Sequence, residues 1–343
     1  MTTSRLGKLR SRRLDPLVKV AGVHEAYERL VGEDDSVRYA IGAMQPIDEA
    51  YNERTITERA RVEKQLADGF RSAVLGIEFD YQGSVTNDTN IRAYSDVDLL
   101  TVESRWFAIE PPNVPTWPYI GNEIENLREI RSASIKILRN AFPEATVDAS
   151  GAKCVNISGR SLRRRVDVIA CARWDTVEYV STRQKHWRGI EILDNAKGQR
   201  LPNKPFLHNR RIEERDAKTN GGLRKFIRLL KSLRYDNDEK IELSSYDIAG
   251  IAFNNFDSWL TAQPGNDLSL VSNGLSYLRY VLTNDDYRAS LDMPNKTRKV
   301  FGPDGASKAG LEQLTKAMDV LMAEIEQAFR RSLRKLDEAR INY

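Results

Sequence analysis

Apolar residues follow two different spacings along the chain, and the change between them divides it. Before residue 200, short runs alternate apolar and polar positions, as half-buried strands do, and longer runs repeat apolar positions at helical spacing. The alternating runs predict strands at 77–81, 96–102, 152–158, 164–171 and 189–193. The helical runs predict helices at 16–31, 48–75 and 122–141. This order indicates an α+β fold, with a small mixed sheet flanked by helices.

Only helical spacing occurs after 194–207, a segment that contains Gly198, Pro202 and Pro205 and is predicted to be a hinge. Helices are predicted there at 221–235, 244–256, 267–283 and 307–340. We therefore expect two domains: residues 1–200, a catalytic core with N-terminal helices, and residues 201–343, a C-terminal helical lobe. Residues 1–14 are rich in Arg and Lys and lack acids, which predicts a mobile basic arm.

The composition, 41% hydrophobic and 30% charged over 343 residues, is that of a soluble globular protein. No apolar run is long enough to span a membrane and no signal sequence follows the start, so we expect a cytoplasmic protein without a membrane partner. The presence of only 2 cysteines and 3 histidines excludes a Cys/His zinc site. A net charge of +4 argues against a globally basic polymer binder, so no stable nucleic-acid partner is expected.

The candidate chemistry begins at Gly83 and Ser84, which are followed after a polar loop by Asp96 and Asp98. A Gly-Ser turn leaves backbone N–H groups open to a phosphate, because glycine has no Cβ. In a strand over 96–102, the two carboxylates point to one face and their apolar neighbours to the other. Carboxylates this close repel each other, so they are expected to hold cations, most naturally Mg²⁺ carrying substrate phosphates. The alternative is a hairpin with a solvated acidic edge.

A third carboxylate, Asp167, lies inside a Val/Ile-rich run, where Val166 and Val168 flank it. By alternation, its side chain lies on the face opposite those valines. An acid inside such a run is costly to bury without a partner, which favours a third metal ligand. The alternative is an acid that faces solvent on an edge strand.

The Gly-Ser turn, the pair Asp96 and Asp98 and the third acid Asp167 together resemble the signature of the DNA polymerase β nucleotidyltransferase superfamily. Within it, residues 50–300 look like the CD-NTases, which are the cyclic-GMP-AMP-synthase-like and DncV-like nucleotidyltransferases of bacterial anti-phage signalling. The resemblance implies a catalytic lobe and a helical lobe with the active site in the cleft between them. It also implies two Mg²⁺ ions, with Mn²⁺ as a substitute, and nucleoside triphosphate substrates, ATP being the first guess.

Three further residues are assigned to the nucleotide, beside Gly83 and Ser84. Lys231 lies on a predicted helix and supplies a point charge for the triphosphate. Ser245 and Tyr246 open the next helix, whose N-terminus suits an anion, and the ring of Tyr246 can stack on a base. The alternatives are a solvated lysine, a simple helix N-cap at Ser245 and a core tyrosine.

The mechanism expected from these residues is two-metal catalysis, in which a ribose hydroxyl displaces pyrophosphate from a nucleoside triphosphate. A second such step would close a cyclic di- or trinucleotide, a second messenger whose downstream effector and regulatory proteins are further expected partners. One alternative is a toxin-like enzyme that adds nucleotides to tRNA or protein. Another is a non-catalytic binder on the same fold. The modest net charge favours small substrates.

Overall fold

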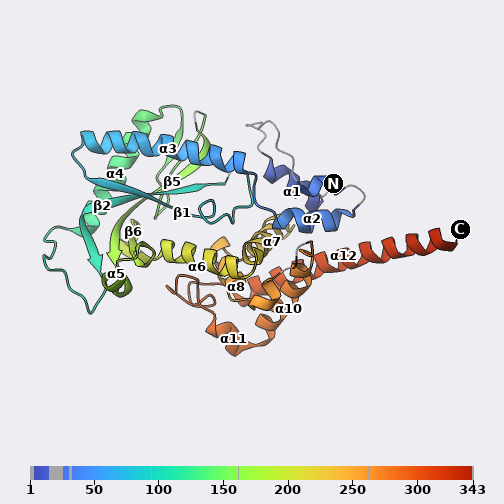
Figure 1. Cartoon of the computed structure of the whole chain (residues 1–343). Coiled ribbons are helices and arrows are strands. Elements are labelled where there is room, and N and C mark those ends of the chain that lie inside the picture. Colours follow the sequence, from blue (N-terminus) through green and yellow to red (C-terminus); the bar gives the residue numbers. More distant parts are fainter. Residues whose placement is uncertain are drawn as a thin grey trace. The chain divides into compact units, whose positions relative to one another are not determined.

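The computed structural model describes residues 4–14, 26–30, 33–93, 95–160, 162–261, 263 and 265–341 (Figure 1). These residues fall into two compact units. Glu49–Arg211 form one, which we call the sheet unit, and the described residues before and after that range form the other, the helical unit. The boundary between them falls inside one helix, α6 (Pro205–Lys218).

The described part of the sheet unit contains one mixed seven-stranded sheet, with the order β1-β2-β5-β4-β3 and with β6 and β7 continuing from β5. Its strands are β1 (Ile77–Gln82), β2 (Val97–Ile109), β3 (Thr146–Asp148), β4 (Val155–Gly159), β5 (Leu162–Asp175), β6 (Gly189–Asp194) and β7 (Gln199–Asn203). β2 and β5 run parallel, whereas their other neighbours run antiparallel. The α+β class with a small mixed sheet is therefore confirmed.

Two long helices, α3 (Glu49–Ser72) and α4 (Glu123–Ala141), lie on one face of this sheet (Figure 1). Their apolar stripes enclose a core that includes Leu66, Ile130, Leu99 and Val168, all nearly or fully buried. Burying such side chains contributes about 1.5–3 kcal/mol each. The opposite face carries a smaller cluster around Leu100, to which Phe206 of α6 is added. Two short elements complete the unit: α5 (Val177–Thr182) and the 3₁₀ turn η2 (Lys185–Trp187).

The helical unit is built around α7 (Gly222–Asp236), which packs against α2, α8 and α12. The other described elements are α1 (Arg5–Arg13), η1 (Ala26–Arg29), α2 (Asp35–Met44), α8 (Ser245–Phe253), α9 (Asp257–Leu260), α10 (Ser269–Thr283), α11 (Asp285–Ser290) and α12 (Lys308–Ile341). Leu223, Phe226 and Leu230 of α7 are fully buried in the core of this unit. No helix of the described chain is both long enough and apolar enough to cross a membrane.

The expected mobile arm at 1–14 is wrong for its described part, because Arg5–Arg13 form α1. Arg12 is buried and donates to both carboxylate oxygens of Asp236, at 3.1 and 2.8 Å. Leu6 and Leu9 on the same helix are also buried. The basic residues that suggested a solvated arm therefore include one that forms a buried ion pair. The helix expected at 16–31 lies mostly outside the described residues.

The predicted hinge at 194–207 contains strand β7, which forms a hairpin with β6. Gly198 supplies the turn with φ of 60°, a conformation that glycine adopts at low cost. Pro202 lacks an N–H donor, but it is tolerated because β7 pairs only with β6 and forms an edge. Gly198 and Pro202 thus belong to a hairpin and its edge strand, not to a hinge. The chain passes to the helical unit further on, inside α6.

The two compact units also group the N-terminal helices differently from the predicted domains. Residues 1–200 were expected to form one domain, but α1 and α2 share a hydrophobic core with α7 and α12. The physical reason is the apolar faces of these short helices, which are buried against helices from the far end of the sequence. Leu9, Ala40 and Met44 are examples, each fully or nearly fully buried there.

Candidate active site

The two central carboxylates, Asp98 and Asp167, lie directly opposite each other on adjacent strands. Asp98 of β2 is paired in register with Asp167 of the parallel strand β5. Gln82 on β1 pairs with Asp98, and Asn156 on β4 pairs with Asp167, so one polar row crosses four strands. Asp96 lies two residues before Asp98, just ahead of β2. Strand pairing therefore gathers the three predicted carboxylates at one end of β2.

Gly83 lies at the end of β1, against the carboxylate of Asp98. Its φ is 101°, and a Cβ built on it would lie 2.7 Å from Asp98 Oδ2. Any side chain at this position would therefore strike the carboxylate as well as strain the backbone. Ser84 follows, half-buried, and its carbonyl accepts a hydrogen bond from the Thr89 N–H at 2.9 Å. The predicted Gly-Ser turn and the acidic strand are thus in direct contact.

Burial and neighbouring charges shift the ionisation of Asp98 and Asp96. Burial first, and then the charges of Asp167 and Asp96, raise the pKa of Asp98 to about 7. Burial also raises the pKa of Asp96, although the nearby Arg92 and Arg165 oppose that shift. Like charges held this close favour any cation that can bind between them.

Basic and amide groups already contact the carboxylates of Asp96 and Asp167. Arg165 Nε lies 3.2 Å from Asp167 Oδ1 and 3.9 Å from Asp96 Oδ2. Arg92 Nη2 lies 4.0 Å from Asp96 Oδ2, and Asn156 Nδ2 donates to Asp167 Oδ1. Within the described residues, no three His, Cys, Asp or Glu side chains are gathered closely enough to hold one metal ion as they lie.

The donor set nonetheless fits a hard divalent cation. Carboxylate oxygens are what Mg²⁺ and Mn²⁺ prefer, and Asp98 and Asp167 lie on adjacent strands in register, facing the same side of the sheet. The raised pKa of Asp98 marks negative charge that lacks full compensation by the protein. A cation could be held here after side-chain rotation of Asp96 and Asp167 away from their present partners.

The predicted nucleotide residues of the second half all lie in the helical unit. Lys231 of α7 is only 6% exposed, which argues against the solvated alternative. The N-cap of α8 is Ser244, whose hydroxyl accepts from the Asp247 N–H, so Ser245 is exposed at the first helical position and is not the cap. Tyr246 is half-buried, with its hydroxyl 2.8 Å from Asn295 Oδ1 and the Arg298 guanidinium 5.2 Å from its ring centre.

Comparison with known proteins decides the family. A family model described as the cGAS/DncV-like nucleotidyltransferase C-terminal helical domain matches residues 210–326. A cyclic dinucleotide synthase, CdnE, from Yersinia aleksiciae is 36% identical over 313 residues, which are 90% of this chain and 82% of that protein. The chain belongs to the CD-NTase family. It is a nucleotidyltransferase, and the resemblance seen in the sequence is confirmed.

Solved structures agree with this CD-NTase in fold. A STING-associated CdnE c-di-GMP synthase from Capnocytophaga granulosa has a TM-score of 0.76 and 25% identity, over 94% of this chain and 98% of that one. A second, from Flavobacteriaceae sp., has a TM-score of 0.78 and 23% identity, over 94% and 97% of the two chains. The catalytic sheet with a C-terminal helical domain is thus the fold of the family.

Sequence reasoning missed the groups that contact the acids of this CD-NTase. Asn156 had a signal, because it alternates with Val155 and Ile157 as Asp167 does with its valines. Arg165 ends a basic run at 160–165, whose charge alone is equally typical of a solvated hairpin. The pairing of β4 with β5 reveals that Asn156 lies beside Asp167, and Arg165 lies two residues before Asp167 on the same face of β5.

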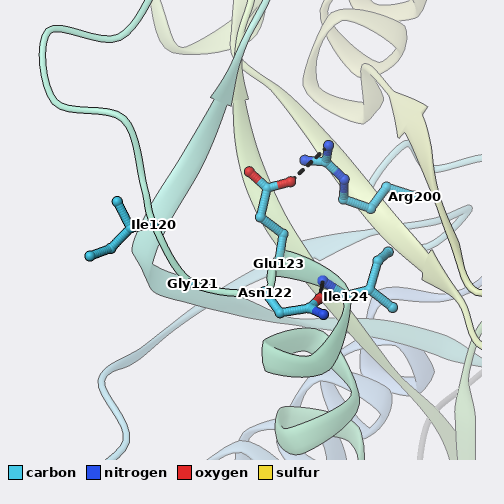
Figure 2. A pocket seen from close by; sticks show the side chains of 6 residues that line it. All are labelled: Ile120, Gly121, Asn122, Glu123, Ile124 and Arg200. Atoms are coloured by element: carbon cyan, nitrogen blue, oxygen red, sulfur yellow. Dashed lines mark hydrogen bonds and ion pairs between the residues drawn. The ribbon is translucent and has the colours of Figure 1, made fainter.

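A separate pocket of about 450 Å³ lies where α4 begins, and none of the predicted site residues lines it (Figure 2). Glu123 and Arg200 meet across it in an ion pair of 2.9 Å. The Asn122 side chain points back to the backbone of α4, where it accepts from the Ile124 N–H at 3.1 Å. This pocket is therefore lined by a helix cap and a surface ion pair rather than by the carboxylate row.

Proposed function

We propose that this CD-NTase joins nucleoside triphosphates into a cyclic dinucleotide, with release of pyrophosphate. The observation that carries the proposal is the register of Asp98 against Asp167, with Asp96 beside them and Gly83 in contact. Cyclic dinucleotide synthesis is also the activity named for its relatives, including the one that is 36% identical. Two relatives of known structure are named as STING-associated, which supports a signalling role in anti-phage defence.

We further propose that Asp96, Asp98 and Asp167 hold two Mg²⁺ ions, for which Mn²⁺ can substitute. Such ions would neutralise phosphate charge and lower the pKa of an attacking ribose hydroxyl. The protein's own part is to hold Asp98 and Asp167 in register on one face of the sheet, with Asp96 just ahead of β2, so that side-chain rotation alone is needed to hold the ions. The lack of a side chain at Gly83 leaves room for the Asp98 carboxylate, and the turn of Gly83 and Ser84 would offer its backbone N–H groups to a phosphate.

Lys231, Ser245 and Tyr246 are proposed to bind the nucleotide. The buried Lys231 can add charge to a triphosphate, and the Ser245 hydroxyl is not required as the cap of α8. Tyr246 offers an aromatic ring whose hydroxyl is held by Asn295. ATP remains the first guess for a substrate, and the relatives named as c-di-GMP synthases, at 29% and 30% identity, add GTP as a second candidate.

The test is pyrophosphate release by variants in which one carboxylate becomes an amide. Asp96→Asn, Asp98→Asn and Asp167→Asn are each expected to lose activity by at least about a thousandfold, because metal charge stabilisation supplies several kcal/mol. The matched control is Asp68→Asn, which changes an exposed acid of α3 paired only with Arg71 at 3.3 Å. Ordinary activity in a folded double variant, Asp96→Asn with Asp98→Asn, would contradict the proposal.

A further inference from the structure

Arg165 is placed to bind two of the three proposed metal ligands at once. It lies on β5, two residues before Asp167, so both side chains lie on the same face of the sheet. Its Nε is 3.2 Å from Asp167 Oδ1 and 3.9 Å from Asp96 Oδ2. Its side chain is 48% exposed, so it has room to move away without disturbing the core.

A divalent cation and this guanidinium need the same oxygen atoms. Mg²⁺ binds carboxylate oxygens at about 2.0–2.1 Å and demands near-octahedral geometry, so Asp96 and Asp167 must turn toward it. A cation there would also repel a guanidinium only a few ångströms away and would weaken its attraction to the neutralised carboxylates. Binding of the cation and the present contacts of Arg165 therefore oppose each other.

We propose that Arg165 is a positioning residue that holds Asp96 and Asp167 and gives them up when a divalent cation binds. Its role is to set the cation concentration at which the site fills, while keeping the carboxylates ordered at lower concentrations. Arg92 reinforces the hold on Asp96 at a longer distance, 4.0 Å. The inference rests on the metal assignment under the proposed function. It adds that Arg165 competes with the cation for Asp96 and Asp167.

The experiment follows the melting temperature of the full-length protein, stripped with EDTA, during a titration with MgCl₂. Arg165→Ala is expected to reach its half-maximal shift at about five-fold lower Mg²⁺ than the wild type, the effect of losing one partly exposed ion pair. Arg165→Gln, which keeps much of the side chain without its charge, is run beside it and should show the same fall. The control Arg71→Ala removes an equal charge from α3, where Arg71 pairs with Asp68, and should match the wild type.

The outcomes separate this inference from the metal assignment. If the wild type responds to MgCl₂ but the Arg165→Ala and Arg165→Gln midpoints are unchanged or higher, Arg165 does not compete with the cation and the inference is overturned. If Arg71→Ala lowers the Mg²⁺ midpoint as much as the Arg165 variants do, the effect is one of net charge and the inference is likewise overturned. If neither MgCl₂ nor MnCl₂ changes the melting temperature of the wild type, the metal assignment is overturned, and this inference with it.

Discussion

Charge and steric fit act on the same few atoms around Asp98. Its carboxylate lies beside Asp167 of the adjacent strand. Gly83 lies so close that a Cβ added to it would strike the Asp98 carboxylate. The repulsion of like charges costs stability, whereas a backbone φ of 101° at Gly83 is adopted by glycine without strain and would strain any other residue. Residues that lower stability in this way, while gathering charge at one place, are typical of catalytic sites.

Asp98→Asn is expected to raise the melting temperature in EDTA while abolishing nucleotidyl transfer. Burial and the neighbouring carboxylates raise the folded-state pKa of Asp98 to about 7, above its ordinary value of 3.8, so its ionisation lowers stability progressively as pH rises from about 4 to about 7, and the cost levels off at higher pH. The amide removes this cost, a gain on the order of 2 kcal/mol at mildly alkaline pH. Asp68→Asn serves as the control. A lower melting temperature for Asp98→Asn than for the wild type would contradict the repulsion.

Gly83→Ala should lose activity far beyond its effect on stability. Its Cβ would lie 2.7 Å from Asp98 Oδ2, so the carboxylate or the turn must shift. The chain offers a matched control in Gly159, whose φ is 91° but where an added Cβ meets nothing within 4 Å. Both variants are expected to lose about 1–3 kcal/mol of stability through backbone strain. Only Gly83→Ala should lose activity, measured as pyrophosphate release, and equal activities would argue against a tight turn at the carboxylate.

Lys231→Ala is expected to weaken nucleotide binding, because a charge on the triphosphate is used mainly to hold the substrate. KM should rise at least as much as kcat falls, by about 1–3 kcal/mol in total. Lys225→Ala on the same helix is the control, since Lys225 pairs with Asp267 at 2.7 Å. Steady-state kinetics of both variants check the prediction. An unchanged nucleotide affinity in folded Lys231→Ala would leave the lysine a structural role only.

At the scale of elements, segments that bury one continuous apolar face were predictable, and several short segments without such a pattern were not. The helices α3, α4, α7 and α12 and the strands β1, β2 and β5 follow their apolar spacing, because each buries one continuous face. β7 and α1 went unpredicted, because their stability comes from partners distant in the sequence or from neighbouring strands. The same holds for the site: alternation marked the three acids, whereas the position of Asn156 beside Asp167 depends on the pairing of β4 with β5.

The pairing of α1 with α7 gives a test at this scale. Arg12 and Asp236 are both nearly fully buried, and Asp236 also accepts from the Tyr39 hydroxyl at 3.0 Å. Removing one partner of such a pair leaves an uncompensated buried charge, so Arg12→Met should cost about 3–5 kcal/mol. Arg10→Met is the control, because Arg10 is 42% exposed and lies 3.4 Å from Glu28. Denaturant unfolding measures the stability of both variants. Equal unfolding midpoints for Arg12→Met and Arg10→Met would contradict the docking of α1 on α7.

At the scale of the whole molecule, the two compact units divide the proposed tasks. The sheet unit holds the carboxylates that would carry the chemistry, and the helical unit holds Lys231, Ser245 and Tyr246, which are proposed to bind the nucleotide. The chain crosses from one unit to the other inside a continuous helix, α6, so the two units are joined there without a flexible linker.

The central claim is that this CD-NTase makes a cyclic product from nucleoside triphosphates alone. The direct measurement supplies Mg²⁺ and the four triphosphates, one α-labelled in each reaction, followed by phosphatase treatment and separation. A cyclic dinucleotide has no terminal phosphate and is left unchanged by the phosphatase, whereas a linear product loses its 5′-triphosphate, keeps label only in its internal linkage and therefore changes its mobility on separation. We predict a small resistant product with the wild type and with Asp68→Asn, and none with Asp98→Asn. Strong labelling of added tRNA without any small product would contradict the account.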